Sequence, residues 1–162
     1  MTAARVSSPP APPMIFVAFS VPGRAAPQGS KRHVGHGIMV ESSARLRPWR
    51  AAVTAAAIEA RDGAPPITGP VYLRVDISFP RPAGHFGTGR NAGKLRPSAP
   101  YFAPSRAVGD LSKLIRAVED AITDAGLWRD DSQVVVVTAV KRHVADESEE
   151  PRTRIRIEAP PS

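Results

Sequence analysis

The chain has no cysteine and no long apolar run, and both absences narrow what it can be. Without cysteine among its 162 residues, it forms neither disulfide bonds nor thiolate metal sites, which suits a reducing compartment. Its first residues, MTAARVSSPPAPP, lack the apolar stretch of a signal peptide, and no segment approaches membrane-spanning length. We therefore expect a soluble, cytoplasmic protein with no membrane partner.

Acidic residues are scarce in the first two thirds of the chain. Residues 1–109 hold 14 Lys and Arg against 4 Asp and Glu, whereas residues 110–162 hold 8 against 11. A strongly basic region favours a polyanionic partner, because phosphate neutralisation releases condensed counterions. An acidic region would repel phosphate unless its carboxylates were paired or held a metal ion. Together the two regions fit a metal-dependent nuclease, and a basic surface without a partner is the alternative.

The length and the hydrophobic patterns predict one α+β domain with a mixed sheet and two main helices. Residues 1–13 form an arm, residues 14–158 the domain and residues 159–162 a tail. Strands are expected at 14–21, 71–79, 134–144 and 152–158, the last pairing with its predecessor as a hairpin. Short extended pieces around residues 33–34 and 38–40 form a small hairpin. An alanine-rich helix covers residues 43–61, with Trp49, Ala52, Val53, Ala56 and Ala57 able to face the core.

The segment from Asp110 to Val137 concentrates the chemistry of the chain. Its apolar residues recur at the three-and-four spacing of an amphipathic helix over about residues 110–125. Asp110 stands where an N-cap belongs, and Gly126 where a left-handed C-cap belongs. The β-branched run from Val134 to Val137 is typical of a buried strand. An acidic pair, Asp130 and Asp131, lies between the helix and this strand, so carboxylates stand at both ends of the helix.

Residues 80–109 form a long connection with five prolines, five glycines, several cations and no acid. Loops of this length are usually functional or disordered. Its cations and the aromatic residues Tyr101 and Phe102 suit a grip on distorted nucleic acid, with the rings stacked on unpaired bases. A disordered surface loop is the alternative.

The order D-L-x-K-L-x-R-A-x-x-D, followed by a glycine, an aromatic residue and D-D-x-Q-V-V, resembles the RusA family of Holliday-junction resolvases, including forms carried by phages. The similarity extends more loosely through VPGRAAPQGSKR, LRPWRAAV and GRNAGKLRPSAP. It implies a dimeric, Mg²⁺-dependent and structure-selective endodeoxyribonuclease that acts on branched DNA in recombination and repair. Such an enzyme works in the cytoplasm of a bacterial or phage-infected cell.

The resemblance also implies roles for individual residues. Asp110 and Asp131 fall at catalytic aspartates, and their oxygens suit Mg²⁺, with Mn²⁺ as an alternative ion. Arg116 falls at a catalytic cation. Apart from the resemblance, Asp130 and Asp120 are candidates for support through hydrogen bonds to the metal ligands, and Asp130 is also a candidate ligand. The expected DNA contacts are Lys31, Arg32, Arg90, Lys94, Arg96, Arg106 and Lys113.

Each of these residues also has a structural alternative. Asp110 is explained as a helix cap, Arg116 with Asp120 as an ordinary i,i+4 pair, and Asp130 with Asp131 as a turn. The segment with Lys31 and Arg32 is explained as a solvated turn. His33 and His36 flank glycine-containing sequence and are not expected to share a metal.

The predicted helix separates the two candidate metal ligands. A helix of about sixteen residues is about 24 Å long, whereas the six residues from its end to Asp131 reach at most about 20 Å. Asp110 and Asp131 of one chain therefore meet with difficulty. The simplest arrangement is a twofold dimer in which each site takes one aspartate from each chain.

Ser112 departs from the family pattern, which has a second aspartate at this position. A hydroxyl is a poor Mg²⁺ ligand beside a carboxylate, so metal affinity is expected to drop. Two functions follow: an active junction-resolving nuclease, or a catalytically weakened protein that binds branched DNA without cutting it. A third, a basic RNA-binding or scaffolding domain, leaves both acidic helix ends unexplained.

Overall fold

The computed structural model describes residues 14–29, 31–33, 39–41 and 44–160. The predicted arm at 1–13 and the end of the tail at 161–162 lie outside the described residues. The regular elements are β1 (Ile15–Pro22), β2 (Lys31–His33), β3 (Met39–Glu41), α1 (Leu46–Arg61), β4 (Val71–Phe79), α2 (Leu111–Asp124), β5 (Val134–His143) and β6 (Arg152–Glu158). None of the helices in this part of the chain is long and apolar enough to span a membrane.

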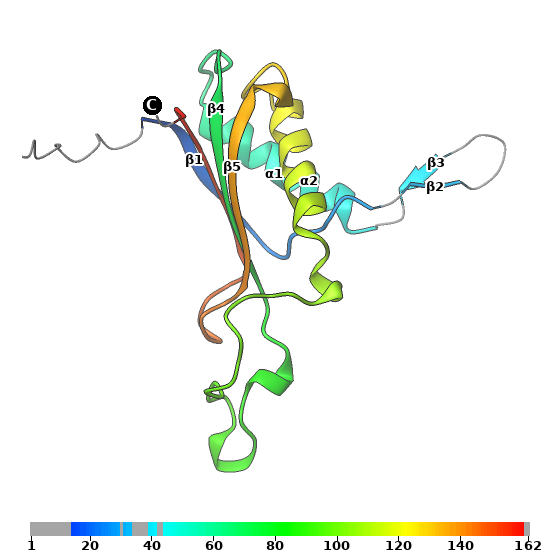
Figure 1. The fold of residues 1–162 in the computed structure, drawn as a ribbon, viewed down its shortest axis with the longest axis vertical. Coiled ribbons are helices and arrows are strands. Elements are labelled where there is room, and N and C mark those ends of the chain that lie inside the picture. The colour runs from blue at the N-terminus through cyan, green and yellow to red at the C-terminus, as the bar shows by residue number, and fades with distance from the viewer. Residues whose placement is uncertain (1–13, 30, 34–38, 42–43, 161–162) are drawn as a thin grey trace, which may run out of the picture.

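The main sheet is mixed, which confirms the expected α+β class for a single domain (Figure 1). Its strand order is β1-β6-β4-β5; β6 runs antiparallel to both of its neighbours, and β4 and β5 are parallel. Helix α2 makes the crossover between these two parallel strands, as parallel pairing requires. The separate pair β2-β3 forms the small predicted hairpin.

The predicted hairpin between the last two strands is wrong, because β4 lies between β5 and β6. The inward positions of β6, Thr153, Ile155 and Ile157, are at most 2% exposed, which a central strand provides and an edge strand does not. Strand β5 takes the edge instead. Its Val135 and Val137 are 58% and 43% exposed, so the predicted buried strand at 134–137 is also corrected.

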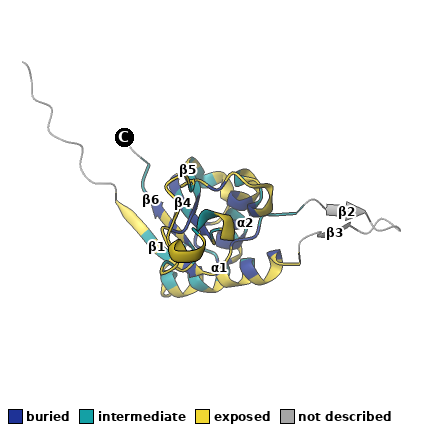
Figure 2. Cartoon of the chain, turned by 90° about the horizontal axis from the view of Figure 1, so that it is seen from below, coloured by how far each residue is buried: buried dark blue, intermediate teal, exposed yellow. Residues whose placement is uncertain are grey.

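Both helices cover one face of the sheet and leave the other face open (Figures 1 and 2). Alternation along β4 sends Leu73, Val75 and Ile77 into the core. The apolar stripe of α2 packs on the same core through Leu114, Val118 and Ile122, all fully buried. Burial of this stripe fixes α2 against the sheet and determines which of its faces meets solvent.

Helix α1 begins at Leu46 rather than near Ser43, which lies outside the described residues. Trp49, Val53 and Ala57 face the core as predicted, whereas Ala52 is exposed. Pro48 sits in the first turn, where its missing N–H breaks no helical hydrogen bond.

The connection 80–109 extends away from the sheet beyond the end of β4 (Figure 1). It contains the 3₁₀ turns η1 (Ala83–His85), η2 (Gly89–Asn91) and η3 (Arg106–Val108). A bridge between Phe86 and Leu95 joins its two limbs. Gly87 permits a close approach, since a Cβ there would lie 2.5 Å from the carbonyl oxygen of Asn91. The connection therefore has defined local structure.

Arg142, near the C-terminal end of β5, links β4 to the turn between β5 and β6. This side chain is 9% exposed; its Nε donates to Asp76 Oδ1 at 3.0 Å, and its Nη2 donates to Glu149 Oε1 at 2.8 Å. The hydrogen bond from Arg142 and the backbone N–H of Ala145 lower the pKa of Glu149 to about 2. The charged carboxylate therefore stabilises the native state.

Replacing Glu149 with glutamine is expected to lower the free energy of unfolding at pH 7 by about 2 kcal/mol. Because the pKa of Glu149 is lowered from 4.5 to about 2, its contribution is complete above about pH 5 and is lost as the pH falls towards 2. Urea denaturation of both proteins between pH 2 and pH 7 measures this, and their difference should shrink at low pH. Glu150→Gln is the matched control, since Glu150 is 80% exposed; equal losses in the two variants would contradict the account.

Candidate active site

Asp110 lies at the N-terminal end of α2, at the N-cap position. Its backbone is extended there, yet its side chain makes no capping hydrogen bond and is 71% exposed. Lys113 Nζ lies 3.7 Å from its Oδ2. The proposed role as a helix cap does not account for this carboxylate, which remains available to a ligand.

Two contacts fix the backbone that carries Asp110. Lys141 Nζ donates to the carbonyl oxygen of Gly109 at 2.6 Å. Gly109 has a φ of +86°, and a Cβ there would lie 2.5 Å from Pro27 Cγ, so no other residue fits without a shift. The position of Asp110 is therefore set by β5 on one side and by the segment after β1 on the other.

Ser112, Lys113 and Arg116 are exposed in the first turns of α2. Arg116 follows Ser112 by one turn on the same face. The backbone N–H of Gln28 donates to the carbonyl oxygen of Lys113 at 3.1 Å, so the PQG segment contacts this end of the helix. Lys31 and Arg32 follow in β2, and their side chains lie outside what the structure describes.

The D-D-x-Q motif forms a capped turn that leaves Asp131 exposed. Asp130 is the N-cap of η4 (Asp131–Gln133) and accepts from the Ser132 N–H at 2.8 Å; hydrogen bonds from the Ser132 side chain and from this N–H lower the Asp130 pKa. Gln133 accepts from the backbone N–H of Arg129 at 2.9 Å. Gln133 also donates to the carbonyl oxygens of Ile67 and Gly69, at 3.0 and 2.9 Å. Asp130 and Gln133 thus organise the turn.

Glu119, in the C-terminal half of α2, lies close enough to Asp131 of η4 to be affected by its charge. Burial raises the Glu119 pKa, and the charges of Asp131 and Asp120 raise it further, while Arg116 opposes them. Glu119 was not among the predicted site residues, although it lies seven residues after Ser112 and three after Arg116, on the same helical face. Nine residues separate Asp110 from Glu119, about 14 Å along the helix axis.

Asp120 lies on the side of α2 that faces α1. Its carboxylate is 3.7 Å from Arg50 Nη1, and Asp124 is 2.6 Å from Arg50 Nη2. The predicted pair between Arg116 and Asp120 is therefore not found among the described residues. These contacts join the two helices and direct Asp120 away from the exposed face.

The described part of a single chain contains no cluster of three or more histidine or acidic side chains that could hold a metal ion. Asp110 stands at one end of α2, and Asp131 is associated with Glu119 near the other. The donor chemistry suits a hard divalent cation, since all three groups are carboxylates. The described part of one chain therefore does not bring these three carboxylates together.

Arg90, Lys94, Arg96 and Arg106 are exposed on the connection 80–109. Arg96 has a structural contact, because its Nε donates to the carbonyl oxygen of Phe86 at 2.8 Å. Arg81 likewise fixes the base of the connection by donating to the carbonyl oxygens of Val144 at 2.6 Å and Pro100 at 2.9 Å. The exposed cations therefore lie on a connection whose conformation Arg81 and Arg96 stabilise.

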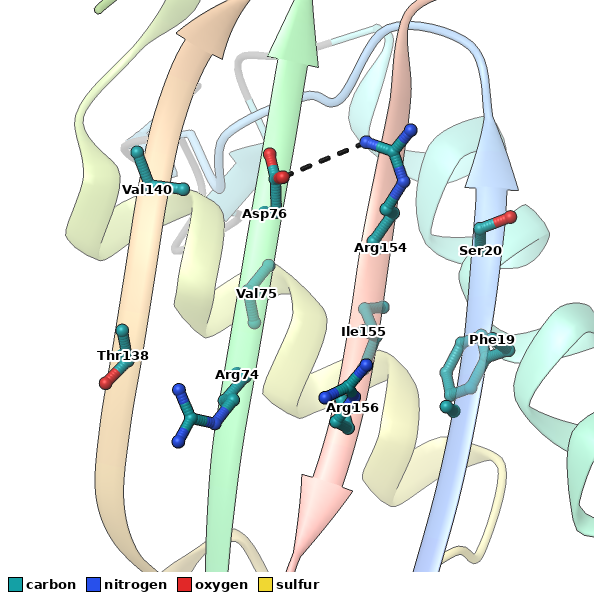
Figure 3. A pocket seen from close by; sticks show the side chains of 11 residues that line it. Phe19, Ser20, Arg74, Val75, Asp76, Thr138, Val140, Arg154, Ile155 and Arg156 are labelled. Carbon is teal, nitrogen blue, oxygen red and sulfur yellow. Dashed lines mark ion pairs between the residues drawn. The ribbon is translucent and has the colours of Figure 1, made fainter. Parts of the chain in front are cut away.

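A hollow of about 550 Å³ lies on the open face of the sheet, opposite α2 (Figure 3). Arginines line it, but acids pair with them: Arg154 is 3.8 Å from Asp76, and Arg74 is 3.1 Å from Glu158. Neither Asp110 nor Asp131 borders it. We therefore place the candidate active site on the exposed face of α2.

A family model described as endodeoxyribonuclease RusA matches residues 22–158, most of the chain. The fold and this match place the protein in the class of DNA endonucleases. The chain belongs to the RusA family, whose members resolve Holliday junctions. No curated protein matches the sequence significantly.

Glu119→Gln is expected to raise the free energy of unfolding by about 0.5–1 kcal/mol at pH 7 in EDTA, because it removes one of two neighbouring negative charges. Chemical denaturation of both proteins in EDTA measures this change. The exposed Glu59 of α1 supplies the control variant Glu59→Gln, which should leave stability unchanged. Unchanged or reduced stability of Glu119→Gln would contradict the described electrostatics.

Proposed function

We propose that the protein is a Mg²⁺-dependent endonuclease that cuts four-way DNA junctions at sites on the exposed face of α2. The strongest support comes from Asp110 and Asp131, two exposed carboxylates at the positions of the family's catalytic aspartates. Arg116 lies on the helix between them. Exposed carboxylates beside basic segments repel DNA unless a cation intervenes. The RusA family match supplies the reaction class.

Asp110 and Asp131 would hold Mg²⁺, or Mn²⁺ as an alternative, through carboxylate oxygens. When bound, such an ion polarises the phosphate and lowers the pKa of a water nucleophile. Glu119 adds negative charge beside Asp131, and Arg116 stabilises charge that develops on the scissile phosphate. Lys113, Arg90, Lys94 and Arg106 would contact phosphates outside the reacting centre.

We propose a dimer in which each site combines Asp110 of one chain with Asp131 of the other. An antiparallel meeting of two α2 helices would bring the N-terminal end of each to the C-terminal half of its partner. The edge strand β5 contacts α2 and exposes Val135 and Val137, which supplies apolar area for such a surface. A twofold arrangement also suits symmetric cleavage of two strands.

Mixing an Asp110→Asn protein with an Asp131→Asn protein tests the composite site. Each homodimer lacks a carboxylate in both sites, whereas a heterodimer regains one complete site. We expect the mixture to recover cleavage of a labelled junction, measured after subunit exchange has been verified. No recovery in exchanged heterodimers would contradict the composite arrangement.

A second candidate function, a branched-DNA-binding protein with weak cleavage, follows from Ser112. The side chain is exposed in the first turn of α2, where an aspartate is also favoured by the helix dipole. Ser112→Asp would add a carboxylate on the same helical end as Asp110 without repacking the core.

We expect Ser112→Asp to raise Mg²⁺-dependent junction cleavage by roughly tenfold or more. The assay compares both proteins on a labelled four-way junction and a matched linear duplex, with and without Mg²⁺. Binding without cutting by the protein with Ser112 would favour the second function. Equal cleavage rates for the two proteins would show the interpretation of Ser112 to be wrong, and a lack of junction preference would count against both functions.

A further inference from the structure

Tyr101 and Phe102 form an exposed aromatic pair at the base of the connection 80–109. Their side chains are 54% and 62% exposed, and their rings meet edge to face with centroids 5.0 Å apart. Aromatic rings are normally a large part of the area that a fold or an interface buries. Two adjacent exposed rings in contact with each other therefore point to a ligand.

The backbone of this pair is attached to the sheet. The backbone N–H of His143 donates to the carbonyl oxygen of Tyr101 at 2.8 Å, and the backbone N–H of Ala103 donates to the carbonyl oxygen of Lys141 at 3.2 Å. Phe102 itself is bridged antiparallel to Arg142 at the end of β5. The rings thus stand on a backbone that is already ordered, which lowers the entropic cost of binding.

Phe102 also borders the end of α2 that carries Asp110. It lines a shallow groove of about 260 Å³ together with Pro104, Leu111 and Lys141. Leu111 directly follows Asp110, and Lys141 holds the carbonyl oxygen of Gly109 at 2.6 Å. The groove is smaller than the roughly 300–1,000 Å³ of pockets for drug-sized ligands, so it suits a single planar ring.

The surrounding charge selects the kind of occupant. Residues 80–109 contain no acid, and Arg90, Lys94 and Arg106 take part in no ion pair found among the described residues. A second copy of this connection would bring like charge against it. A polyanion whose planar groups can stack fits both the rings and the cations.

We propose that Phe102, supported edge to face by Tyr101, stacks on an unpaired base at the branch point of the DNA. The inference rests on the proposed function and adds the group that recognises the branch. A base at a branch leaves the helical stack at lower free-energy cost than a base within a duplex. Stacking on Phe102 therefore favours branched DNA over duplex DNA, whatever its sequence. Its proximity to Leu111 then places the adjoining backbone on the Asp110 side of the groove.

The test measures binding of full-length protein to a four-way junction and to a linear duplex of the same sequence, in EDTA so that no cleavage occurs. Junctions with 2-aminopurine at the branch report on base stacking. Phe102→Ala is compared with Phe16→Ala, since Phe16 is a 39% exposed phenylalanine on β1, and thermal unfolding verifies that both variants fold.

We expect Phe102→Ala to weaken junction binding about 5- to 100-fold, as loss of one base–aromatic stack predicts, and to abolish the branch-specific fluorescence change. Duplex binding should stay within about twofold, because phosphate contacts dominate it. Phe16→Ala should change neither.

Three results for Phe102→Ala would each overturn the proposed stacking role of Phe102. They are junction binding equal to that of the unmodified protein, an equal loss of binding to both DNAs, and a change in oligomeric state. An unmodified protein without junction preference would overturn the proposed function as well, and this is seen before any variant is compared.

Discussion

The burial of one apolar stripe of α2 against the mixed sheet is the constraint on which the rest of the structure depends. Leu114, Val118 and Ile122 are inaccessible to solvent, so rotation of the helix would expose apolar side chains that are now buried. Its 14 residues extend about 21 Å, which keeps the carboxylates at its two ends apart. A site that needs both ends must therefore be completed from outside the chain.

Neighbouring groups leave these end carboxylates exposed. At the C-terminal end, Gly126 takes the left-handed conformation and Trp128 donates to Thr123 at 2.7 Å, while Asp130 and Gln133 cap the following turn. Asp131 is thus relieved of any capping role, and Asp110 keeps an exposed carboxylate although it occupies an N-cap position. The partly buried Glu119 beside Asp131 carries an electrostatic cost that a bound cation would offset.

Local patterns predicted the elements well, and their tertiary relations less well. Alternation in β4 and the helical spacing in α2 identified both elements, because each depends on one buried face. The pairing of β6 with β4 depends on contacts distant in sequence, so local alternation suggested the simpler hairpin with β5. The ion pair of Asp120 with Arg50 and the proximity of Glu119 to Asp131 involve different elements, so the spacing within one helix does not reveal these partners. The exposure of Val135 and Val137 follows from the edge position of β5, which their β-branched character does not reveal.

The most direct test of the composite site uses the absence of native cysteine, which permits single-site labelling. Chains carrying Ser112→Cys and chains carrying Ser132→Cys, distinguished by size, are mixed, allowed to exchange and treated with a short bismaleimide. Both serines are exposed, one beside each end of α2. The composite site predicts a covalent species that joins one chain of each kind. A third protein carries both substitutions in one chain. A bridge within that single chain, or no bridge between the two kinds of chain in a verified dimer, would contradict the composite site.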